Sequence, residues 1–452
     1  MQIIKGNIYS KLETDNKKLL KLLEKKYTFK VPNAFYAMKN SRGKWDGNKK
    51  FFSSKTGKFG TGLLSAILED LKTVKAEFNL LEKVSTMPIH QESIPSLSLR
   101  DYQREALEKI DFHNGRGVIK APTGSGKTLI LAEICNKYKN CFGLVFFTKK
   151  QILYQTYEFL KKHGIDCGIV CGDSHEIKPI TLCTIQSIDK IIDTHLDTAK
   201  FIIFDEIHEF GKGKISISCL KSFPKAEVRL GFSATPPSEN THKYTVQSFL
   251  GPIIYDITSK ELIEQEFLAE PNIFILKASP PKKYLFDSKT NYQKTYQEYI
   301  IENDNRNKQI EDIVKSINKG KILILTKNLQ HAHILKEKIK GSFQLEGKDP
   351  MSLRNSTIKK FLKQDKAILI GTVILQTGVD IPEITHFINA RGMKSEIATI
   401  QAMGRALRMA DNKTTALIYD FFDDTIYLNK HSEERIRHYK KNDFNLNLYN
   451  EK

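Results

Sequence analysis

The segment APTGSGKT, residues 121–128, constrains the fold more than any other part of the sequence. An apolar run over residues 117–121 leads into it, and a helix-forming run over residues 129–138 follows it. A strand, a glycine-containing loop and a helix in this order form a cradle in which loop amides and the helix N-terminus face a phosphate group. The segment therefore predicts a nucleotide-binding loop whose residues are Thr123, Gly124, Ser125, Gly126, Lys127 and Thr128. Within it we expect Lys127 to reach the terminal phosphates and Thr128 to offer its hydroxyl to magnesium.

The length and charge of the chain limit its organisation and its partners. With 452 residues it exceeds what one hydrophobic core usually organises, so we expect two or three domains. It carries 71 Lys and Arg against 52 Asp and Glu, a formal net charge of +19. Basic surfaces gain affinity for nucleic acids by releasing counterions, which favours a polyanionic partner, although charge alone leaves a merely solvated basic surface open. The six cysteines and the lack of a long apolar run indicate a cytoplasmic protein.

Residues 1–96 are expected to form a small basic domain of mixed α+β structure that contributes accessory DNA binding. Between residues 5 and 58 the chain has 15 Lys and Arg but 4 Asp and Glu. The segment 42–64 interleaves aromatic side chains with lysines, and its candidate DNA contacts are Lys44, Trp45, Lys49 and Lys50. Lysines bind phosphates and aromatic rings stack on exposed bases. The alternative is that Trp45 and the nearby Phe51, Phe52 and Phe59 are simply the core of this domain.

Residues 97–250 alternate between strand and helix patterns, which predicts a parallel sheet covered by helices. The apolar strand in FIIFDEIH, residues 201–208, ends in two adjacent acids. Asp205 at the end of the strand can hold magnesium through water, and Glu206 can orient or deprotonate the attacking water. Upstream of the phosphate loop, Gln103 can read an adenine edge, because its side-chain amide both donates and accepts hydrogen bonds.

Residues 251–452 show a second alternating pattern, with strands expected at 321–326, 343–347, 367–372, 386–391 and 415–421. No phosphate loop occurs among them, so this domain is not expected to bind nucleotide by itself. In QAMGRALR, residues 401–408, the side chains of Gln401, Arg405 and Arg408 are spaced to share one helix face. Arginines presented in this way can neutralise charge on a transferring phosphoryl group. The sequence does not predict a role for ENDNRNKQI, residues 302–310.

The motifs between residues 99 and 408 together resemble superfamily 2 helicases, and DEIH matches the DExH subgroup. The resemblance implies two tandem RecA-like domains of the α/β class that bind ATP with magnesium. It implies that Gly378 and Asp380 contact the nucleotide at the interdomain cleft. It also implies that His208, Ser233, Thr235 and Gln401 couple hydrolysis to movement, and that Thr148, Gln186 and Thr372 contact the nucleic-acid strand.

The N-terminal segments KWDG and FGTGLL resemble the leading domain of phage UvsW-type helicases. Those enzymes remodel branched DNA such as forks, Holliday junctions and R-loops in recombination, repair and replication restart. The resemblance implies a phage protein of the host cytoplasm whose partners are branched or forked duplexes and single-stranded DNA. Three alternatives stay open: a DExH RNA helicase, the translocase subunit of a restriction-type system, and a DNA-binding or annealing module with an inactive ATPase.

Overall fold

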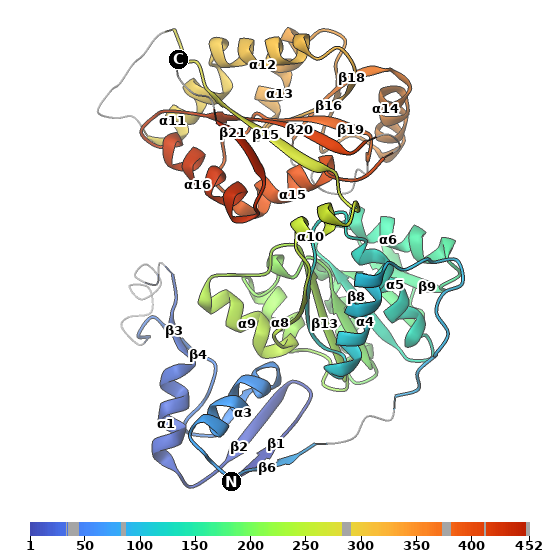
Figure 1. The fold of residues 1–452 in the computed structure, drawn as a ribbon. Coiled ribbons are helices and arrows are strands. Elements are labelled where there is room, and N and C mark those ends of the chain that lie inside the picture. The colour runs from blue at the N-terminus through green and yellow to red at the C-terminus, as the bar shows by residue number, and fades with distance from the viewer. Residues whose placement is uncertain are drawn as a thin grey trace. The chain divides into compact units, whose positions relative to one another are not determined.

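The computed structural model describes residues 1–32, 34, 45–82, 87–282, 291–372, 381–410 and 413–448 (Figure 1). Contacts within the chain divide it into two units. The first comprises Met1–Ala121 and Gly126–Asp256, and the second comprises Ile257–Lys452 together with Pro122–Ser125. The first unit contains the small N-terminal domain and an α/β domain, and the second unit contains another α/β domain.

The N-terminal domain has the expected α+β composition. Its elements are β1 (Gln2–Ile4), β2 (Tyr9–Glu13), α1 (Lys17–Lys26), β3 (Thr28–Lys30), β4 (Asn48–Lys50), β5 (Lys58–Gly60), η1 (Thr61–Leu63), α3 (Leu64–Thr73) and β6 (Asn79–Leu81). The four-stranded sheet has the order β5-β2-β1-β6, and β3 pairs with β4. In α1, the buried Leu19 and Leu23 lie four residues apart and therefore on one face of the helix. They meet Ile67 and Leu71 of α3 in a single core.

This domain is packed against helix α9 (Asn240–Leu250) of the first α/β domain by close backbone approach and by aromatic stacking. A Cβ atom added at Gly62 would lie 1.9 Å from the backbone oxygen of Gln247 in α9. The ring of Phe29 stacks on that of Tyr244, another α9 residue, with centroids 4.4 Å apart. The GTG sequence at 60–62 is therefore required because only glycine lets the two backbones come this close.

The first α/β domain is built on an eight-stranded sheet in the order β10-β9-β11-β8-β12-β13-β7-β14. All of its strand pairs are parallel except β9 with β10. Its further elements are α4 (Asp101–Phe112), β7 (Arg116–Lys120), α5 (Lys127–Lys137), β8 (Gly143–Phe147), α6 (Lys150–Lys162), β9 (Cys167–Cys171), β10 (Ser174–His175), β11 (Ile180–Thr184), η2 (Ile185–Ser187), α7 (Asp189–His195), β12 (Phe201–Phe204), η3 (Ile207–Glu209), α8 (Lys214–Lys221), β13 (Val228–Ser233) and β14 (Ile253–Asp256).

The end of the first α/β domain differs from the expected boundary at residue 250. Strand β14 follows that residue and pairs in parallel with β7 at the edge of the sheet. Because these hydrogen bonds join β14 to the first sheet, the first unit continues to Asp256. Strands β12 and β13 at the centre of the sheet are buried along their whole length, as is typical of a parallel sheet covered on both faces.

The second α/β domain contains a seven-stranded sheet in the order β17-β18-β16-β19-β20-β15-β21, with every strand pair parallel. Its elements are α10 (Ser259–Glu264), β15 (Glu270–Lys277), α11 (Tyr292–Tyr296), η4 (Gln297–Ile301), α12 (Asp304–Ser316), β16 (Gly320–Leu325), α13 (Leu329–Lys338), β17 (Phe343–Leu345), α14 (Met351–Lys363), β18 (Lys366–Gly371), β19 (Ile384–Asn389), α15 (Glu396–Ala406), β20 (Thr415–Phe422), α16 (Leu428–Lys441) and β21 (Asn445–Leu448). The five expected strands correspond to β16, β17, β18, β19 and β20. None of the helices in the described part of the chain combines the length and the apolar character needed to span a bilayer.

We expect Gly62→Ala to weaken the attachment of the N-terminal domain to α9. The added Cβ would overlap the Gln247 oxygen, and relieving that overlap would require the backbones to move apart. Overpacking of this kind costs about 1–3 kcal/mol of the free energy of unfolding. Urea denaturation of the full chain, with limited proteolysis as a second readout, would measure the loss. Gly213→Ala is the control, because the nearest atom to its new Cβ is Ser216 Oγ at 4.0 Å, and equal losses would contradict the close-approach explanation.

Candidate active site

Parallel strand pairing brings the predicted motor residues of the first unit to one edge of the sheet. The strands β11, β8, β12, β13 and β7 are neighbours in that order. Their pairing aligns Thr184 with Phe147 and Ser233 with Lys120, so their carboxyl ends lie together. The segments after these ends carry Gln186, Thr148, Asp205, Thr235 and the phosphate loop. This is the edge at which open α/β sheets bind their ligands.

The loop between β7 and α5 has the backbone of a phosphate cradle. Gly124 and Gly126 adopt positive φ angles of 89° and 76°, which glycine tolerates without strain. The amide of Ala121 donates to the oxygen of Ser233 at 3.1 Å and so extends the β-ladder into the loop. Lys127 is the first residue of α5, and its Nζ donates to the backbone oxygen of Ala121 at 3.0 Å. The loop amides and the Lys127 ammonium therefore belong to one local structure that fits a polyphosphate.

Gln103 lies against this loop. Its side chain is 1% exposed, and its Oε1 accepts the backbone N–H of Arg100 at 3.0 Å, which caps the first turn of α4. A Cβ added at Gly126 would lie 2.5 Å from Gln103 Nε2. The structure thus brings the predicted adenine-reading residue to the phosphate loop, and adenine recognition stays a prediction.

Asp205 and Glu206 are adjacent acids in contrasting environments. Burial and the charge of Glu206 raise the pKa of Asp205 to about 7, while the Lys127 ammonium opposes the rise. Burial also acts to raise the pKa of Glu206, but the hydrogen bond from His208 and the charge of Lys127 bring it below its usual value. The lowered pKa keeps Glu206 ionised at neutral pH, as a group that orients or deprotonates water requires.

The residues around Asp205 fit magnesium. A carboxylate and a hydroxyl are the oxygen ligands that this ion prefers, and Thr128 lies in the first turn of α5. The raised pKa of Asp205 shows that its charge is poorly compensated by the protein alone, which a divalent cation would correct. When bound with nucleotide, the ion would neutralise phosphate charge. Asp205 and Thr128 are the residues that would hold it.

A buried polar chain links DEIH to Ser233 and Thr235. His208 Nδ1 lies 3.3 Å from Glu206 Oε2 and 3.0 Å from Ser233 Oγ. Ser233 Oγ in turn accepts the backbone N–H of Thr235 at 3.1 Å. Burial acts to lower the pKa of His208, but its contacts with Glu206 and Glu209 prevail and raise it to about 9. Three of the predicted coupling residues are thus joined through a protonated imidazole.

Of the predicted site residues in QAMGRALR, Arg408 lies outside the expected helix. Gln401 and Arg405 lie on α15, but that helix ends at Ala406. Arg408 instead forms a β-bridge with Leu268, and the neighbouring amide of Ala269 donates to Leu407 O at 2.7 Å. The prediction that all three side chains share one helix face is therefore wrong. Burial lowers the pKa of Arg408.

Of the remaining predicted residues of the second unit, Thr372 falls within the described part of the chain. Thr372 follows the end of β18 directly and is partly buried. Gly378 and Asp380 lie outside the described residues, so their predicted roles are not addressed by the structure.

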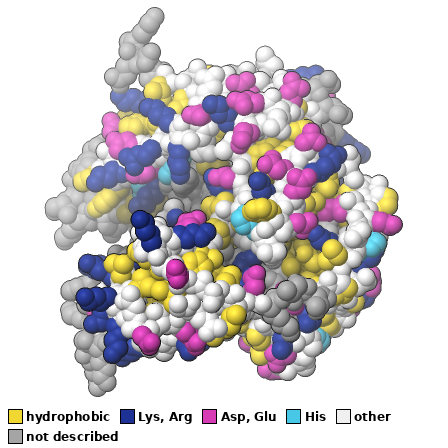
Figure 2. Space-filling view, turned by 60° about the horizontal axis from the view of Figure 1, so that its bottom comes forward, with side chains coloured by type: hydrophobic (Ala, Val, Ile, Leu, Met, Phe, Trp, Pro, Cys, Tyr) yellow, Lys and Arg dark blue, Asp and Glu magenta, His cyan; other side chains and the backbone are white. Residues whose placement is uncertain are grey.

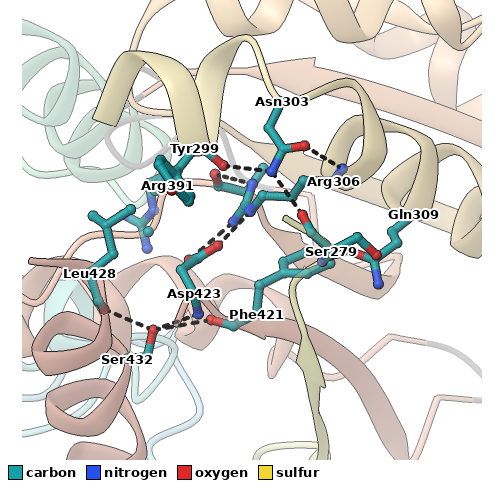
Figure 3. Close-up of polar contacts among 12 residues, drawn as sticks. Ser279, Tyr299, Asn303, Arg306, Gln309, Arg391, Phe421, Asp423, Leu428 and Ser432 are labelled. Carbon is teal, nitrogen blue, oxygen red and sulfur yellow. Dashed lines mark hydrogen bonds and ion pairs between the residues drawn. The ribbon is translucent and has the colours of Figure 1, made fainter. Parts of the chain in front are cut away.

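The segment 302–310 anchors the connection between β19 and α15 (Figure 3). Asn303 caps α12 by accepting the backbone N–H groups of Asn305 and Arg306. Arg306 is fully buried, forms an ion pair with Asp423 Oδ1 at 2.7 Å, and donates to Ala390 O at 3.2 Å. An asparagine before a helical pattern is a recognised N-cap signal, so the start of α12 could have been predicted, whereas the burial of Arg306 could not.

Side chains from two further helices, α11 and α16, hold the rest of this connection, which we call the 390–394 loop. Its next four carbonyl groups accept, in chain order, Tyr296 Oη at 2.6 Å, His431 Nδ1 at 3.2 Å, Arg435 Nη1 at 3.1 Å and His438 Nε2 at 3.3 Å. With Arg306 on Ala390, every carbonyl from 390 to 394 is satisfied by a side chain of α11, α12 or α16. The entry to α15, and so the position of Arg405 within this unit, is fixed by these bonds.

The candidate DNA contacts of the N-terminal domain are partly engaged within the protein. Phe52 and Phe59 are each 1% exposed and stack on each other, so the core interpretation holds for both. The Trp45 indole donates to Asn48 O at 2.8 Å. Lys49 Nζ donates to Thr245 Oγ1 at 2.6 Å, and Lys50 pairs with Glu24 at 3.1 Å. Lys44 lies outside the described residues.

Two families match the chain over the segments that form these sites. Residues 96–238 match the family described as Type III restriction enzyme, res subunit, and residues 305–410 match the Helicase conserved C-terminal domain. The chain belongs to superfamily 2 of the helicases. The fold of this helicase, two tandem RecA-like domains, is also that of S. cerevisiae Dbp5 bound to RNA and ADP BeF3, with a TM-score of 0.56 at 15% identity over 77% of this chain and 88% of Dbp5.

Two curated relatives carry names that describe them as a DNA translocase and an ATP-dependent DNA helicase. The DNA 3'-5' translocase XPB2 of Sulfurisphaera tokodaii is 23% identical over 422 residues, which cover 82% of this helicase and 90% of the relative. The ATP-dependent DNA helicase uvsW of Enterobacteria phage T4 is 24% identical over 384 residues, which cover 76% of this helicase and 75% of the relative. This helicase thus has the family's ATP-dependent motor core.

We expect the contribution of His208 to stability to disappear at high pH. Its folded pKa of about 9 lies above the usual value near 6.5, so the stabilisation is fully present below pH 6.5 and is lost as the pH rises through 9. His208→Gln should cost on the order of 2–3 kcal/mol of unfolding free energy at pH 6 and little at pH 10. Urea denaturation in EDTA without nucleotide would measure both. The exposed His175→Gln is the control, and a pH-independent cost at His208 would contradict the protonated chain.

We expect Tyr296→Phe to slow ATP turnover by about tenfold with little change in KM for ATP, because it would displace Arg405, which is predicted to contact the transferring phosphoryl group, and small displacements of such a group are costly. The substitution removes one hydroxyl that donates to Arg391 O and leaves the ring in place. Steady-state ATPase assays would measure the effect. The control is Tyr27→Phe, which removes a buried hydroxyl that donates to Asp70 at 2.8 Å in the N-terminal domain and has no contact with the 390–394 loop. Equal losses of turnover in the two variants would contradict a role of the loop.

Proposed function

We propose that this helicase is an ATP-dependent DNA helicase or translocase that unwinds and remodels branched DNA, including forks, Holliday junctions and R-loops, in recombination, repair or replication restart. The observation that carries the motor part of the proposal is the buried chain from Glu206 through His208 to Ser233 and Thr235. It connects the group that acts on water to the strand-turn segment after β13. A change at the nucleotide can therefore move the protein surface that follows this strand.

The proposed roles in hydrolysis follow from chemistry. The loop amides and Lys127 bind the phosphates, Asp205 and Thr128 hold magnesium, and Glu206, ionised at neutral pH, orients or deprotonates water. Arg405 and Arg408 are proposed to neutralise charge on the transferring phosphoryl group, and Arg408 suits this role because burial strengthens its field. Gln401, Gly378 and Asp380 keep their predicted roles.

DNA as the substrate is supported by charge and by the relatives. A net charge of +19 favours a polyanion, and both curated relatives described above are named as enzymes of DNA. The preference for branches is supported by the basic N-terminal domain, which is seated on α9 and so moves with the first motor domain. In this position it can bind a second arm of the DNA while the motor follows one strand, with Thr148, Gln186 and Thr372 as proposed strand contacts.

The two other motor functions are not better supported. A DExH RNA helicase and a restriction-type translocase would share the phosphate loop, the paired acids and the arginines. Neither has an observation of its own in the described residues that favours it over branched DNA. An inactive ATPase is disfavoured by the intact Lys127, Asp205 and Glu206 and by their mutual electrostatic contact.

ATP hydrolysis by the purified chain should be stimulated most by a synthetic fork or four-way junction, less by single-stranded DNA or duplex, and least by matched RNA. Lys127→Ala should abolish most of the turnover with every substrate, because the phosphates lose their only loop cation. Arg405→Ala should lower it roughly 10³-fold if the guanidinium acts on the transferring phosphoryl group. Stimulation by RNA alone would overturn the DNA role and keep the motor, and no turnover with any substrate would overturn both.

A further inference from the structure

A cavity of about 540 Å³ lies where the N-terminal domain meets α8 and α9 of the first motor domain. Its volume is in the range of ordinary ligand sites. The N-terminal domain contributes residues 49–56 and 58–60 with Tyr9 and Glu24, and the motor domain contributes Ile217, Lys221, Thr245, Ser248 and Phe249. None of its lining residues belongs to the motor motifs or to the predicted strand contacts. Two of them, Lys49 and Lys50 at the end of β4, are candidate DNA contacts of the N-terminal domain.

The charge of this cavity is strongly one-sided. Its lining carries five lysines, Lys49, Lys50, Lys55, Lys58 and Lys221, against one carboxylate, Glu24. Glu24 is already committed, because it pairs with Lys50 at 3.1 Å and accepts the backbone N–H of Ser54 at 3.0 Å. Among the described residues, no carboxylate forms an ion pair with the other four lysines. Like charges gathered in a concave site raise its free energy until an anion enters.

Aromatic rings support these lysines without neutralising them. Lys58 Nζ lies 4.1 Å from the centre of the Tyr9 ring, Lys49 Nζ lies 5.3 Å from that of Phe51, and Lys221 Nζ lies 5.8 Å from that of Phe249. A cation over a ring keeps its full charge and its capacity to donate hydrogen bonds. Burial and the charge of Lys221 lower the pKa of Lys49. These two ammonium groups, one from each domain, therefore repel each other.

The motor side of the cavity is held in place from inside the domain. Arg229 on β13 is fully buried and donates to Leu220 O at 2.5 Å and to Phe249 O at 3.1 Å. These bonds tie the end of α8 to the end of α9, where Lys221 and Phe249 line the cavity. On the other side, Ser53 Oγ and Thr56 Oγ1 each accept a backbone N–H and keep a hydroxyl proton to donate. Both walls are therefore built before any ligand binds.

We propose that this cavity, defined by Lys49, Lys55, Lys58 and Lys221, binds the phosphodiester backbone of nucleic acid. Several separate ammonium groups and nearby hydroxyls match a chain of phosphates better than a single small anion, and such contacts position a backbone without reading its sequence. Lysines of both domains would grip the same backbone segment, so the bound strand would join the N-terminal domain to α8 and α9. Lys and Arg side chains also gather along the left side of the space-filling view (Figure 2). The proposal rests on nucleic acid being the substrate.

Fluorescence anisotropy of a labelled synthetic fork, titrated without ATP at several salt concentrations, tests this site. Lys55→Gln combined with Lys221→Gln should weaken binding by about tenfold at moderate salt and reduce the slope of log affinity against log salt by about two. Lys55→Arg with Lys221→Arg should keep the slope of the unaltered protein. The control pair is Lys18→Gln with Lys21→Gln, two exposed lysines of α1 that do not line the cavity and should leave the slope unchanged.

Equal losses in the cavity pair and the control pair would overturn the proposal, because affinity would then follow net charge alone. An unchanged slope in the cavity pair, or a loss in the Arg pair, would also overturn it. Thermal unfolding of all four proteins reports whether each variant is folded. The ATPase activity of the unaltered chain distinguishes a failure of this site from a failure of the proposed function. If the fork stimulates ATP hydrolysis but the cavity variants bind it normally, the cavity site alone is wrong. If no nucleic acid stimulates ATP hydrolysis, the proposed function is wrong.

Discussion

The parallel pairing of β13 with β7 on one side and with β12 on the other is the constraint on which the first unit depends. It aligns the ends of three strands that are far apart in the chain. The phosphate loop, Asp205 and Ser233 therefore meet at one edge of the sheet, where the Lys127 ammonium acts on both acids. Every residue of β12 and β13 is buried, so a shift of register would expose apolar side chains, and the alignment is strongly specified.

The sequence predicted what local pattern determines and missed what distant contacts decide. The glycine loop, the paired acids and the alternating strands carry their own signals, and the structure has the expected class of fold. The end of α15 was not predictable, because Arg408 leaves the helix to pair with Leu268, which is remote in sequence. Phe52 and Phe59 could be core or surface until α1 and α3 were seen to cover them. The burial of Arg306 also depends on a contact that is remote in sequence, because its partner Asp423 directly follows β20.

Buried ion pairs in the second unit serve placement more than stability. Arg306 with Asp423 and Arg435 with Asp420 are almost fully buried, and the cost of desolvating such groups is comparable to their attraction. Each arginine, however, also donates to the backbone of the 390–394 loop. The acids orient the arginines, and the arginines in turn fix the loop, so the direction of α15 is set by groups on α12 and α16.

The same arrangement limits how the chain can vary in length. Most loops accept an inserted residue because their backbone groups bond to water. In the 390–394 loop each carbonyl has its own donor side chain on α11, α12 or α16, so one extra residue would move every following carbonyl away from its partner. Tags, fluorophores or linker insertions are therefore better placed elsewhere, and the length of this connection should stay constant wherever the surrounding donors are retained.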